Sequence, residues 1–265
     1  MLKEAYDFRD VSEALHELIE PLGEADYGRV TLFRDWTIND VMQHLHFFNY
    51  VADLTLSDEV EFKRVYGNLK IFQEKSGSLV AASDEMLEGL KGIALRDAWR
   101  EYYLEMADRF YAADPKQRLQ WVGPSMSARS SISARLMETW SHAQEIYDLL
   151  GVERVEKDHI KSIAVMGMNT FGWTFKNREE EIPEAVPHVR LTAPSGDIWE
   201  WNAENTDDKI EGKAAEFCQV VTQTRNIADT NLKVEGGIAT RWMSVAQCFA
   251  GPARNPPAPG TRHAG

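Results

Sequence analysis

Residues 36–45 read Trp-Thr-Ile-Asn-Asp-Val-Met-Gln-His-Leu, and this stretch decides how the first half of the chain is interpreted. Thr37 is a residue type that caps helix N-termini, and Asp40 three positions later completes a capping-box-like start. Apolar residues then recur at helical spacing. They are Val41, Leu45, Phe48 and Ala52. The stretch predicts an amphipathic helix that carries His44 on the edge of its buried stripe.

Further helical patterns extend from this stretch in both directions, up to about residue 152. The expected helices cover residues 11–22, 58–74 and 95–113, and a long helix that follows a turn at 121–127 and ends at Leu150. Gly151 comes directly after it, and glycine is favoured just past a helix C-terminus. Four or five long helices joined by short loops predict an antiparallel bundle.

The second half of the chain has the composition of a smaller α/β domain. Two strands are expected at residues 188–193 and 197–202, joined as a hairpin at Pro194-Ser195-Gly196-Asp197. A short strand at 209–212 and helices at 213–225 and 238–249 follow. The tail is rich in proline and glycine, so we expect it to be mobile or loosely docked. The predicted fold is α+β, with domains at 1–152 and 153–250 and a tail at 251–265.

The charge balance restricts the classes of partner. Asp and Glu number 42 against 29 Lys and Arg, a net charge of −13, so a polyanion such as nucleic acid would be repelled. Apolar runs are far shorter than the ~20 residues that span a bilayer, which argues against a membrane protein. No signal peptide is evident, and the two cysteines lack metal-type spacing. We expect a cytoplasmic protein with small-molecule partners, and a homodimer is the oligomer considered.

A carboxylate and an imidazole lie one helical turn apart in the predicted helix before Leu150. Glu138 and His142 are four residues apart, so they share one face and can bind one metal ion together. A third ligand must come from another helix. Three protein ligands with an open fourth position are typical of a catalytic zinc site rather than a structural one.

His44 is the best candidate for this third ligand among the seven histidines. His46 is two residues further along its helix and must point roughly away. His16 neighbours two glutamates and is expected in solvent. The remaining histidines, His159, His188 and His263, lie outside the predicted bundle. Simpler interpretations stay open. Glu-to-His pairs at this spacing are common solvated helix contacts, and Asp40, which lies one turn before His44, is explained by its capping role.

Two motifs resemble a known family. Residues 36–45 resemble the first metal-ligand helix of the DinB-like superfamily and, more narrowly, of the mycothiol-dependent maleylpyruvate isomerase family. Arg135-x-x-Glu138-x-x-x-His142-x-x-Glu145 resembles the second ligand helix of that family, in the same order of His, Glu and His. The family usually has Asp where this chain has Glu145, so that residue is given no role. The stretches 121–127 and 246–252 are similar to an uncharacterised branch of the group.

The resemblance implies a fold and a chemistry. The fold would be a DinB-like antiparallel four-helix bundle followed by a sterol-carrier-like α/β domain. The site would hold a divalent metal, most simply Zn²⁺, on His44, Glu138 and His142, with a water or a thiol in the open position. A dication lowers the pKa of a bound thiol, and a thiolate adds reversibly to an activated double bond.

These implications predict a metal- and thiol-dependent isomerase or S-transferase that acts on a small electrophilic, carboxylate-bearing substrate. The thiol would be a low-molecular-weight one such as mycothiol or glutathione, because Cys218 sits in a core-like helical setting. Two alternatives stay open. One is a metal-dependent hydrolase, in which the open position activates water. The other is a non-enzymatic protein that binds apolar ligands.

Arg225 is the second candidate functional residue. Related isomerases end a similar helix of the second domain with an arginine that reaches the active site, so the resemblance implies a site between the two domains. A guanidinium suits a substrate carboxylate. The alternative is an arginine that binds helix C-terminal carbonyls. Arg190 and Arg241 are less favoured, and Arg135 is expected to pair with Glu138.

Overall fold

The computed structural model describes residues 1–121 and 125–262 of the chain. The chain divides into two compact units, the N-terminal unit Met1–Leu149 and the C-terminal unit Leu150–Gly265. In its described residues the N-terminal unit is helical apart from one pair of short strands and an isolated bridge between Val30 and Thr37. Its elements are α1 (Lys3–Ile19), the 3₁₀ turn η1 (Glu24–Gly28), α2 (Ile38–Ser57), α3 (Glu59–Ser76), α4 (Leu79–Met86), α5 (Gly92–Ala112), β1 (Arg118–Leu119), β2 (Met126–Ser127) and α6 (Ala128–Leu150).

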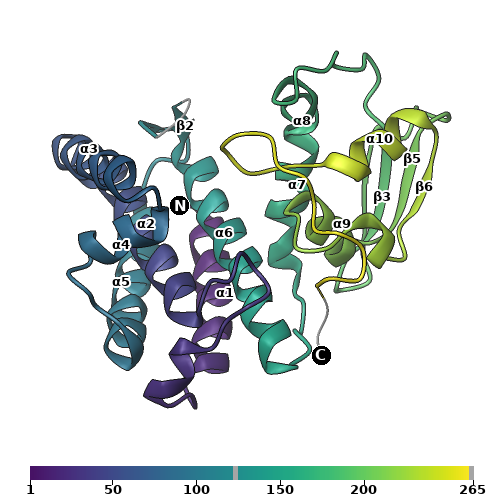
Figure 1. Ribbon diagram of the computed structural model, residues 1–265. Coiled ribbons are helices and arrows are strands. Elements are labelled where there is room, and N and C mark those ends of the chain that lie inside the picture. The colour runs from purple at the N-terminus through teal and green to yellow at the C-terminus, as the bar shows by residue number, and fades with distance from the viewer. Residues whose placement is uncertain (122–124, 263–265) are drawn as a thin grey trace. The chain divides into compact units, whose positions relative to one another are not determined.

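Helices α1, α2, α5 and α6 lie side by side as a bundle (Figure 1). Helix α5 packs against both α1 and α2. Helix α6 is joined to α2 by a hydrogen bond from Arg135 Nε to Asn49 Oδ1, and to α1 by one from Tyr147 Oη to the Ala14 carbonyl. Helices α3 and α4 pack beside α2. The predicted four-helix bundle is therefore confirmed.

Helix α2 begins where its capping residues predict. The Thr37 hydroxyl accepts a hydrogen bond from the Asp40 backbone N–H at 3.1 Å, and Asp40 Oδ2 accepts one from the Thr37 N–H at 2.8 Å. These reciprocal bonds satisfy two backbone donors that a helix start otherwise leaves unpaired. Val41 and Leu45 are fully buried, as the apolar stripe requires.

Three features of this unit differ from expectation. Helix α1 begins at Lys3 rather than near residue 11, because Ala5 and Phe8 continue its buried stripe towards the N-terminus. Helix α4 was not predicted; it has eight residues, and the Ser78 hydroxyl caps it by accepting the Ala81 N–H. Strands β1 and β2 pair antiparallel, and β2 lies inside the stretch 121–127 that was predicted as a turn; residues 122–124 of that stretch lie outside the described residues.

The C-terminal unit contains one four-stranded sheet with helices. Its elements are η2 (Asp158–Ile160), α7 (Lys161–Asn169), α8 (Phe171–Lys176), β3 (His188–Thr192), β4 (Ile198–Trp201), β5 (Lys209–Lys213), α9 (Ala214–Val221), η3 (Ile227–Asp229), β6 (Lys233–Glu235) and α10 (Gly237–Val245). The strand order is β4-β3-β5-β6. Strands β3 and β4 form the predicted hairpin, β5 runs parallel to β3, and β6 is antiparallel to β5. The predicted α+β class is confirmed.

One face of the sheet is packed against helices. Val189 and Leu191 are fully buried, whereas Arg190 and Thr192 between and after them are exposed, as expected for a strand with one covered face. Helix α9 packs against β3 and β5, and α7 packs against α9. The alternation therefore fixes which side of β3 faces the core of this unit.

Two helices of this unit are shorter than predicted, and α7, α8 and β6 were not predicted. Helix α9 ends at Val221, not at Arg225. The Gln223 N–H donates to Val220 O and the Thr224 N–H to Gln219 O, while Gln223 takes the left-handed φ of 59°. This is the Schellman arrangement that ends helices. Helix α10 ends at Val245 rather than at 249.

The expectation of a mobile or loosely docked tail was wrong for residues 251–262. The Arg254 carbonyl accepts a hydrogen bond from Gln223 Nε2, the Arg254 N–H donates to Gln247 Oε1, and the Pro257 carbonyl accepts one from Asn226 Nδ2. Proline lowers the entropic cost of ordering a chain that has such partners, because it restricts the unfolded state.

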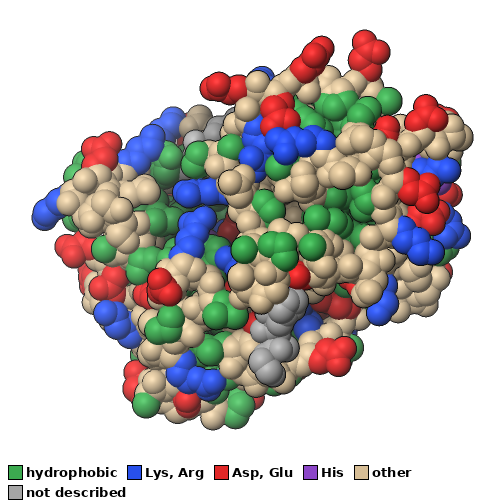
Figure 2. Space-filling model, turned by 45° about the vertical axis from the view of Figure 1, so that its right-hand side comes forward, with side chains coloured by type: hydrophobic (Ala, Val, Ile, Leu, Met, Phe, Trp, Pro, Cys, Tyr) green, Lys and Arg blue, Asp and Glu red, His purple; other side chains and the backbone are tan. Residues whose placement is uncertain are grey.

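The outer surface is mixed in character. Figure 2 shows acidic, basic and apolar side chains interspersed on the viewed face. None of the helices in the described part of the chain has the length and hydropathy of a transmembrane segment.

Candidate metal centre

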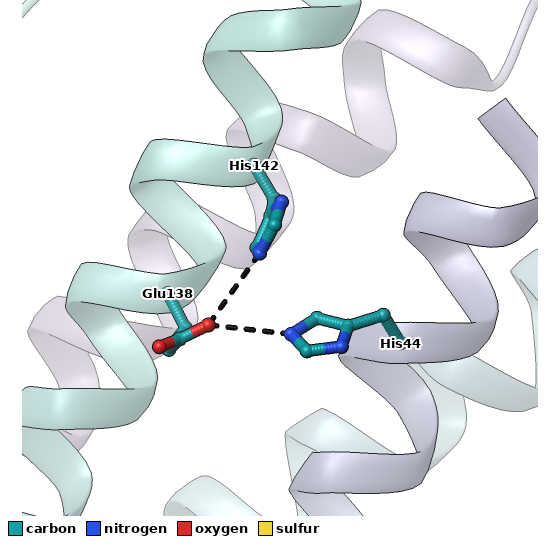
Figure 3. Close-up of side chains that lie close together, drawn as sticks. All are labelled: His44, Glu138 and His142. Atoms are coloured by element: carbon teal, nitrogen blue, oxygen red, sulfur yellow. Dashed lines mark hydrogen bonds and ion pairs between the residues drawn. The ribbon is translucent and has the colours of Figure 1, made fainter. Parts of the chain in front are cut away.

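The structure brings His44, Glu138 and His142 together inside the N-terminal unit (Figure 3). Glu138 Oε2 lies 3.3 Å from His44 Nε2 and 3.5 Å from His142 Nε2. One ligand atom from each residue falls within 4.8 Å of the others. Both imidazoles therefore point their Nε2 atoms at one carboxylate oxygen.

Two helices supply the three side chains. Glu138 and His142 are one turn apart on α6, which places them on one face. His44 comes from α2, on the edge of the stripe that is buried in the bundle. The side chains of both histidines are 12% exposed and that of Glu138 is 27% exposed. The cluster is thus largely enclosed, while part of each side chain stays exposed.

The protonation states suit a metal ligand set. Burial lowers the pKa of His44 to about 4, so its imidazole is neutral at physiological pH. Burial acts to raise the pKa of Glu138, but the hydrogen bonds with His142 and His44 outweigh it and bring that pKa well below its usual range. Metal binding requires neutral imidazoles and ionised carboxylates. His44 and Glu138 are already in these forms near neutral pH.

This donor set is chemically suited to one divalent cation. Two imidazole nitrogens and one carboxylate oxygen are the protein ligands of a well-known class of catalytic zinc sites, which leave a fourth position open. Over residues 1–121 and 125–262, it is the one group of three or more His, Cys, Asp or Glu side chains whose ligand atoms converge in this way. His–Glu hydrogen bonds alone are the competing explanation of the same contacts.

Arg135 directs its hydrogen bonds away from its predicted partner Glu138, although the charge of that carboxylate acts to raise the pKa of Arg135. Its Nε donates to Asn49 Oδ1 at 3.1 Å, and its Nη2 lies 3.5 Å from the Leu45 carbonyl oxygen. The residue is 3% exposed, and burial lowers the pKa of its guanidinium to about 10. The long side chain turns towards α2, because that helix offers acceptors at the packed interface.

Aromatic rings surround the two imidazoles. Trp36 lies parallel to His142, with 5.7 Å between ring centroids and 9° between planes, and its centroid is 5.4 Å from that of His44. Phe33 meets His142 edge-on at 5.1 Å, and Phe48 lies 4.8 Å from His44. Sequence reasoning placed Phe48 in the buried stripe of its helix but assigned neither Phe33 nor Trp36 to the site. The available signal was the position of Trp36, directly before the cap of the ligand helix.

The other bundle histidines lie away from this cluster. The His46 ring meets Tyr102 edge-on, with centroids 5.7 Å apart, and burial lowers its pKa to about 4. His16 was expected in solvent, but it is 7% exposed, because α1 packs it into the bundle; burial lowers its pKa. In the C-terminal unit, His188 Nε2 lies 2.9 Å from Glu200 Oε1. His263 lies outside the described residues.

The remaining candidates belong to the C-terminal unit. Arg225 lies four residues past the end of α9 and is 8% exposed. Its Nη1 donates to the Thr224 carbonyl at 2.8 Å, and its backbone N–H donates to Gln219 O. Its role in substrate binding stays a prediction. Cys218 and Cys248 are buried free thiols, and burial raises the pKa of Cys218 well above its usual range.

Comparison with known proteins identifies relatives along almost the whole chain. An uncharacterised protein of Mycobacterium tuberculosis, found in strains CDC 1551 / Oshkosh and ATCC 25618 / H37Rv, is 32% identical over 246 residues. The match covers 93% of this chain and 95% of the relative. Its identity and coverage are high enough to establish common family membership.

The fold has solved counterparts. A crystal structure of the mycothiol-dependent maleylpyruvate isomerase covers 82% of this chain and 87% of its own, with a TM-score of 0.50 and 14% identity. A mutant of that enzyme matches with a TM-score of 0.50 and 13% identity. At this identity the likeness establishes the fold alone.

Residues 8–147 match the family described as the mycothiol maleylpyruvate isomerase N-terminal domain. The matched region contains all three residues of the cluster, and the family resemblance predicted from the two sequence motifs is confirmed. The chain therefore belongs to the family of the mycothiol maleylpyruvate isomerase N-terminal domain.

Proposed function

We propose that this protein is a metal- and thiol-dependent isomerase or S-transferase for a small electrophilic substrate that carries a carboxylate. The observation that carries the proposal is the convergence of His44, Glu138 and His142 in a partly accessible site. Membership of the maleylpyruvate isomerase family supports the choice of reaction class.

His44, Glu138 and His142 would hold the metal, most simply Zn²⁺, and leave one position for an external ligand. When bound, such a cation lowers the pKa of a coordinated thiol and supplies a thiolate at neutral pH. Glu138 contributes the one negative charge among the three ligands, and the neutral imidazole of His44 requires no proton release before binding. The rings of Phe33, Trp36 and Phe48 pack against the two imidazoles.

The thiol in this proposal is a separate small molecule. Cys218 is fully buried and Cys248 is 5% exposed, and both belong to the core of the C-terminal unit. Mycothiol is the first choice, because the matched family and the solved counterparts carry it in their names. Glutathione is the second.

The proposed reaction begins when the thiolate sulfur forms a bond to one carbon of an activated carbon–carbon double bond. The π electron pair moves onto the conjugated carbonyl, which leaves a single bond that can rotate. In isomerisation the carbon–sulfur bond then breaks, the double bond re-forms in the trans geometry and the thiolate is released, without net proton transfer. In S-transfer the carbanion takes a proton instead and the carbon–sulfur bond persists.

We propose in addition that Arg225 binds the substrate carboxylate. A guanidinium presents two parallel N–H donors that match a carboxylate, which a lysine cannot reproduce. The loop after α9 is suited to hold such a group, because backbone hydrogen bonds from Thr224 and Arg225 to Gln219 O fix its conformation. Arg190 and Arg241 are the alternative cations in this unit.

The decisive experiment measures turnover of maleylpyruvate by the full chain with zinc and a thiol, each supplied or withheld. NMR distinguishes the cis acid, the trans acid and a thioether adduct. We expect turnover only when metal and thiol are both present. Thiol-independent hydrolysis of an ester or amide panel would favour the hydrolase. Binding of apolar ligands without any turnover would favour the binding protein.

A further inference from the structure

We propose that Trp36 is the positioning residue that fixes the orientation of both imidazoles of the metal centre. The inference rests on the proposed metal site and adds a residue to it. Trp36 lies against His142 from α6 and against His44 from α2, with centroid distances of 5.7 and 5.4 Å. One indole thus contacts both histidines of the ligand set.

The hydrogen bonding of His44 explains why a ring is needed. A metal-bound histidine usually donates its second ring N–H to a carboxylate or a carbonyl, and this bond fixes the direction of the ligating nitrogen. The Nδ1 atom of His44 is buried and has no hydrogen-bond partner among the residues that the structure describes. The orientation of the His44 ring therefore depends on packing, which the rings of Trp36 and Phe48 provide.

The backbone that carries Trp36 is held in a demanding conformation. The Trp36 N–H donates to Phe33 O at 2.9 Å, and the Thr31 N–H donates to Trp36 O at 2.7 Å, which closes a tight turn. Its central residues, Arg34 and Asp35, have φ values of 53° and 58°. Turns with two left-handed residues favour Asn-Gly, so an Arg-Asp pair there is conformationally unfavourable. Such a turn persists because the residues before and after it are held in place by the rest of the fold.

Packing around the turn holds Trp36 in place. Phe33 meets the Trp36 ring edge-on at 5.1 Å and also meets His142 edge-on. The Arg34 guanidinium stacks over Phe33, with 4.8 Å from Cζ to the ring centroid. At the other end, Thr37 caps α2, the helix that carries His44. The indole is therefore fixed relative to both ligand helices before any metal binds, which is the condition for a preorganised site.

The test is cobalt(II) binding to the full chain, followed by the visible d–d absorption and by competition with a chromophoric chelator. The variants are Trp36→Leu and Trp36→Phe, and the control is Trp173→Leu, which removes a partly exposed tryptophan of the C-terminal unit. We expect Trp36→Leu to weaken cobalt binding by about 10- to 100-fold, the usual effect of losing a residue that orients metal ligands. Its spectrum should also change, because the imidazoles are no longer held in one orientation.

Trp36→Phe should lose less affinity than Trp36→Leu, because its six-membered ring keeps part of the aromatic contact, although it cannot contact both imidazoles. Trp173→Leu should match the wild type. Circular dichroism identifies which variants fold, and Trp36→Phe decides the question if Trp36→Leu does not. Any folded Trp36 variant with the wild-type affinity and spectrum overturns the role of Trp36 and leaves the metal site standing. A wild-type chain that binds no cobalt or zinc overturns both proposals.

Discussion

Glu138 Oε2 lies 3.3 Å from His44 Nε2, although the two residues are 94 positions apart in the chain. The contact joins α6 to α2 through the only carboxylate of the three-residue cluster. A metal bound there would bind the folded bundle and not the unfolded chain. It would therefore stabilise the fold by mass action, in addition to any catalytic role.

The first prediction concerns metal content. The wild-type chain should bind one zinc ion, and His142→Ala should empty the site, because two ligands rarely retain a metal that needs three. Elemental analysis after dialysis measures the occupancy. His46→Ala is the matched control, since its ring packs against Tyr102 instead. Full occupancy in His142→Ala would show that the ligand assignment is wrong.

The second prediction concerns acid stability of the metal-free protein. Burial lowers the pKa of His44 and of His46 from 6.5 to about 4. Between these values the unfolded chain binds more protons than the folded one, so stability should fall as the pH drops from about 6.5 towards 4. The shift corresponds to at most about 3 kcal/mol per imidazole.

Urea unfolding of the metal-free chain at several pH values in that range measures this effect. His46→Gln removes one of the buried titrating groups, so its stability should depend less steeply on pH than that of the wild type. A free energy of unfolding that stays constant or increases on acidification contradicts the assignment of neutral, buried imidazoles.

The third prediction concerns the buried pair of Arg135 and Asn49, which are joined by a hydrogen bond of 3.1 Å. Asn49→Leu removes the acceptor from a buried guanidinium and should cost about 3 kcal/mol of stability. Arg135→Met strands only a neutral amide and should cost about 1–3 kcal/mol. Denaturant unfolding of both single variants and the double variant measures their coupling. Strictly additive losses would indicate that the two side chains act independently.

The fourth prediction concerns Arg225. Arg225→Lys should lose most of the thiol-dependent turnover, while zinc content and melting temperature stay near those of the wild type, because a point charge does not reproduce two parallel donors. Arg190→Lys, on the exposed side of β3, tests the alternative cation and should keep full turnover if Arg225 binds the carboxylate. Unchanged turnover in Arg225→Lys would remove Arg225 from the proposed site.

The sequence alone was sufficient for the local structure of the ligand helices. Thr37 and Asp40 predicted the start of α2, and the reciprocal hydrogen bonds follow from their spacing. The four-residue spacing of Glu138 and His142 placed both on one face of α6. These features depend on interactions within one helical turn, so neighbouring residues determine them. Elimination among the histidines of the bundle indicated His44 as the candidate third ligand, and the family motifs supported that choice.

Sequence patterns were less informative where partners are distant along the chain. The docked tail depends on hydrogen bonds from Gln223, Asn226 and Gln247, and its composition alone suggested mobility. Helix α9 was predicted too long, because its apolar periodicity gives no sign that Gln223 adopts a left-handed φ. Both features result from contacts that form only after the unit has folded.

The site shows the same division. Residue types and spacing determined which side chains could bind a metal and which helices would carry them. Tertiary structure alone decided that Arg135 turns to Asn49 rather than to Glu138, and that the ring of Trp36 lies against both imidazoles. The physical reason is that a long or flat side chain takes its direction from the neighbours at the helix interface. The packing of α2, α6 and the turn before α2 determines those neighbours. The residues next to the side chain in the sequence do not.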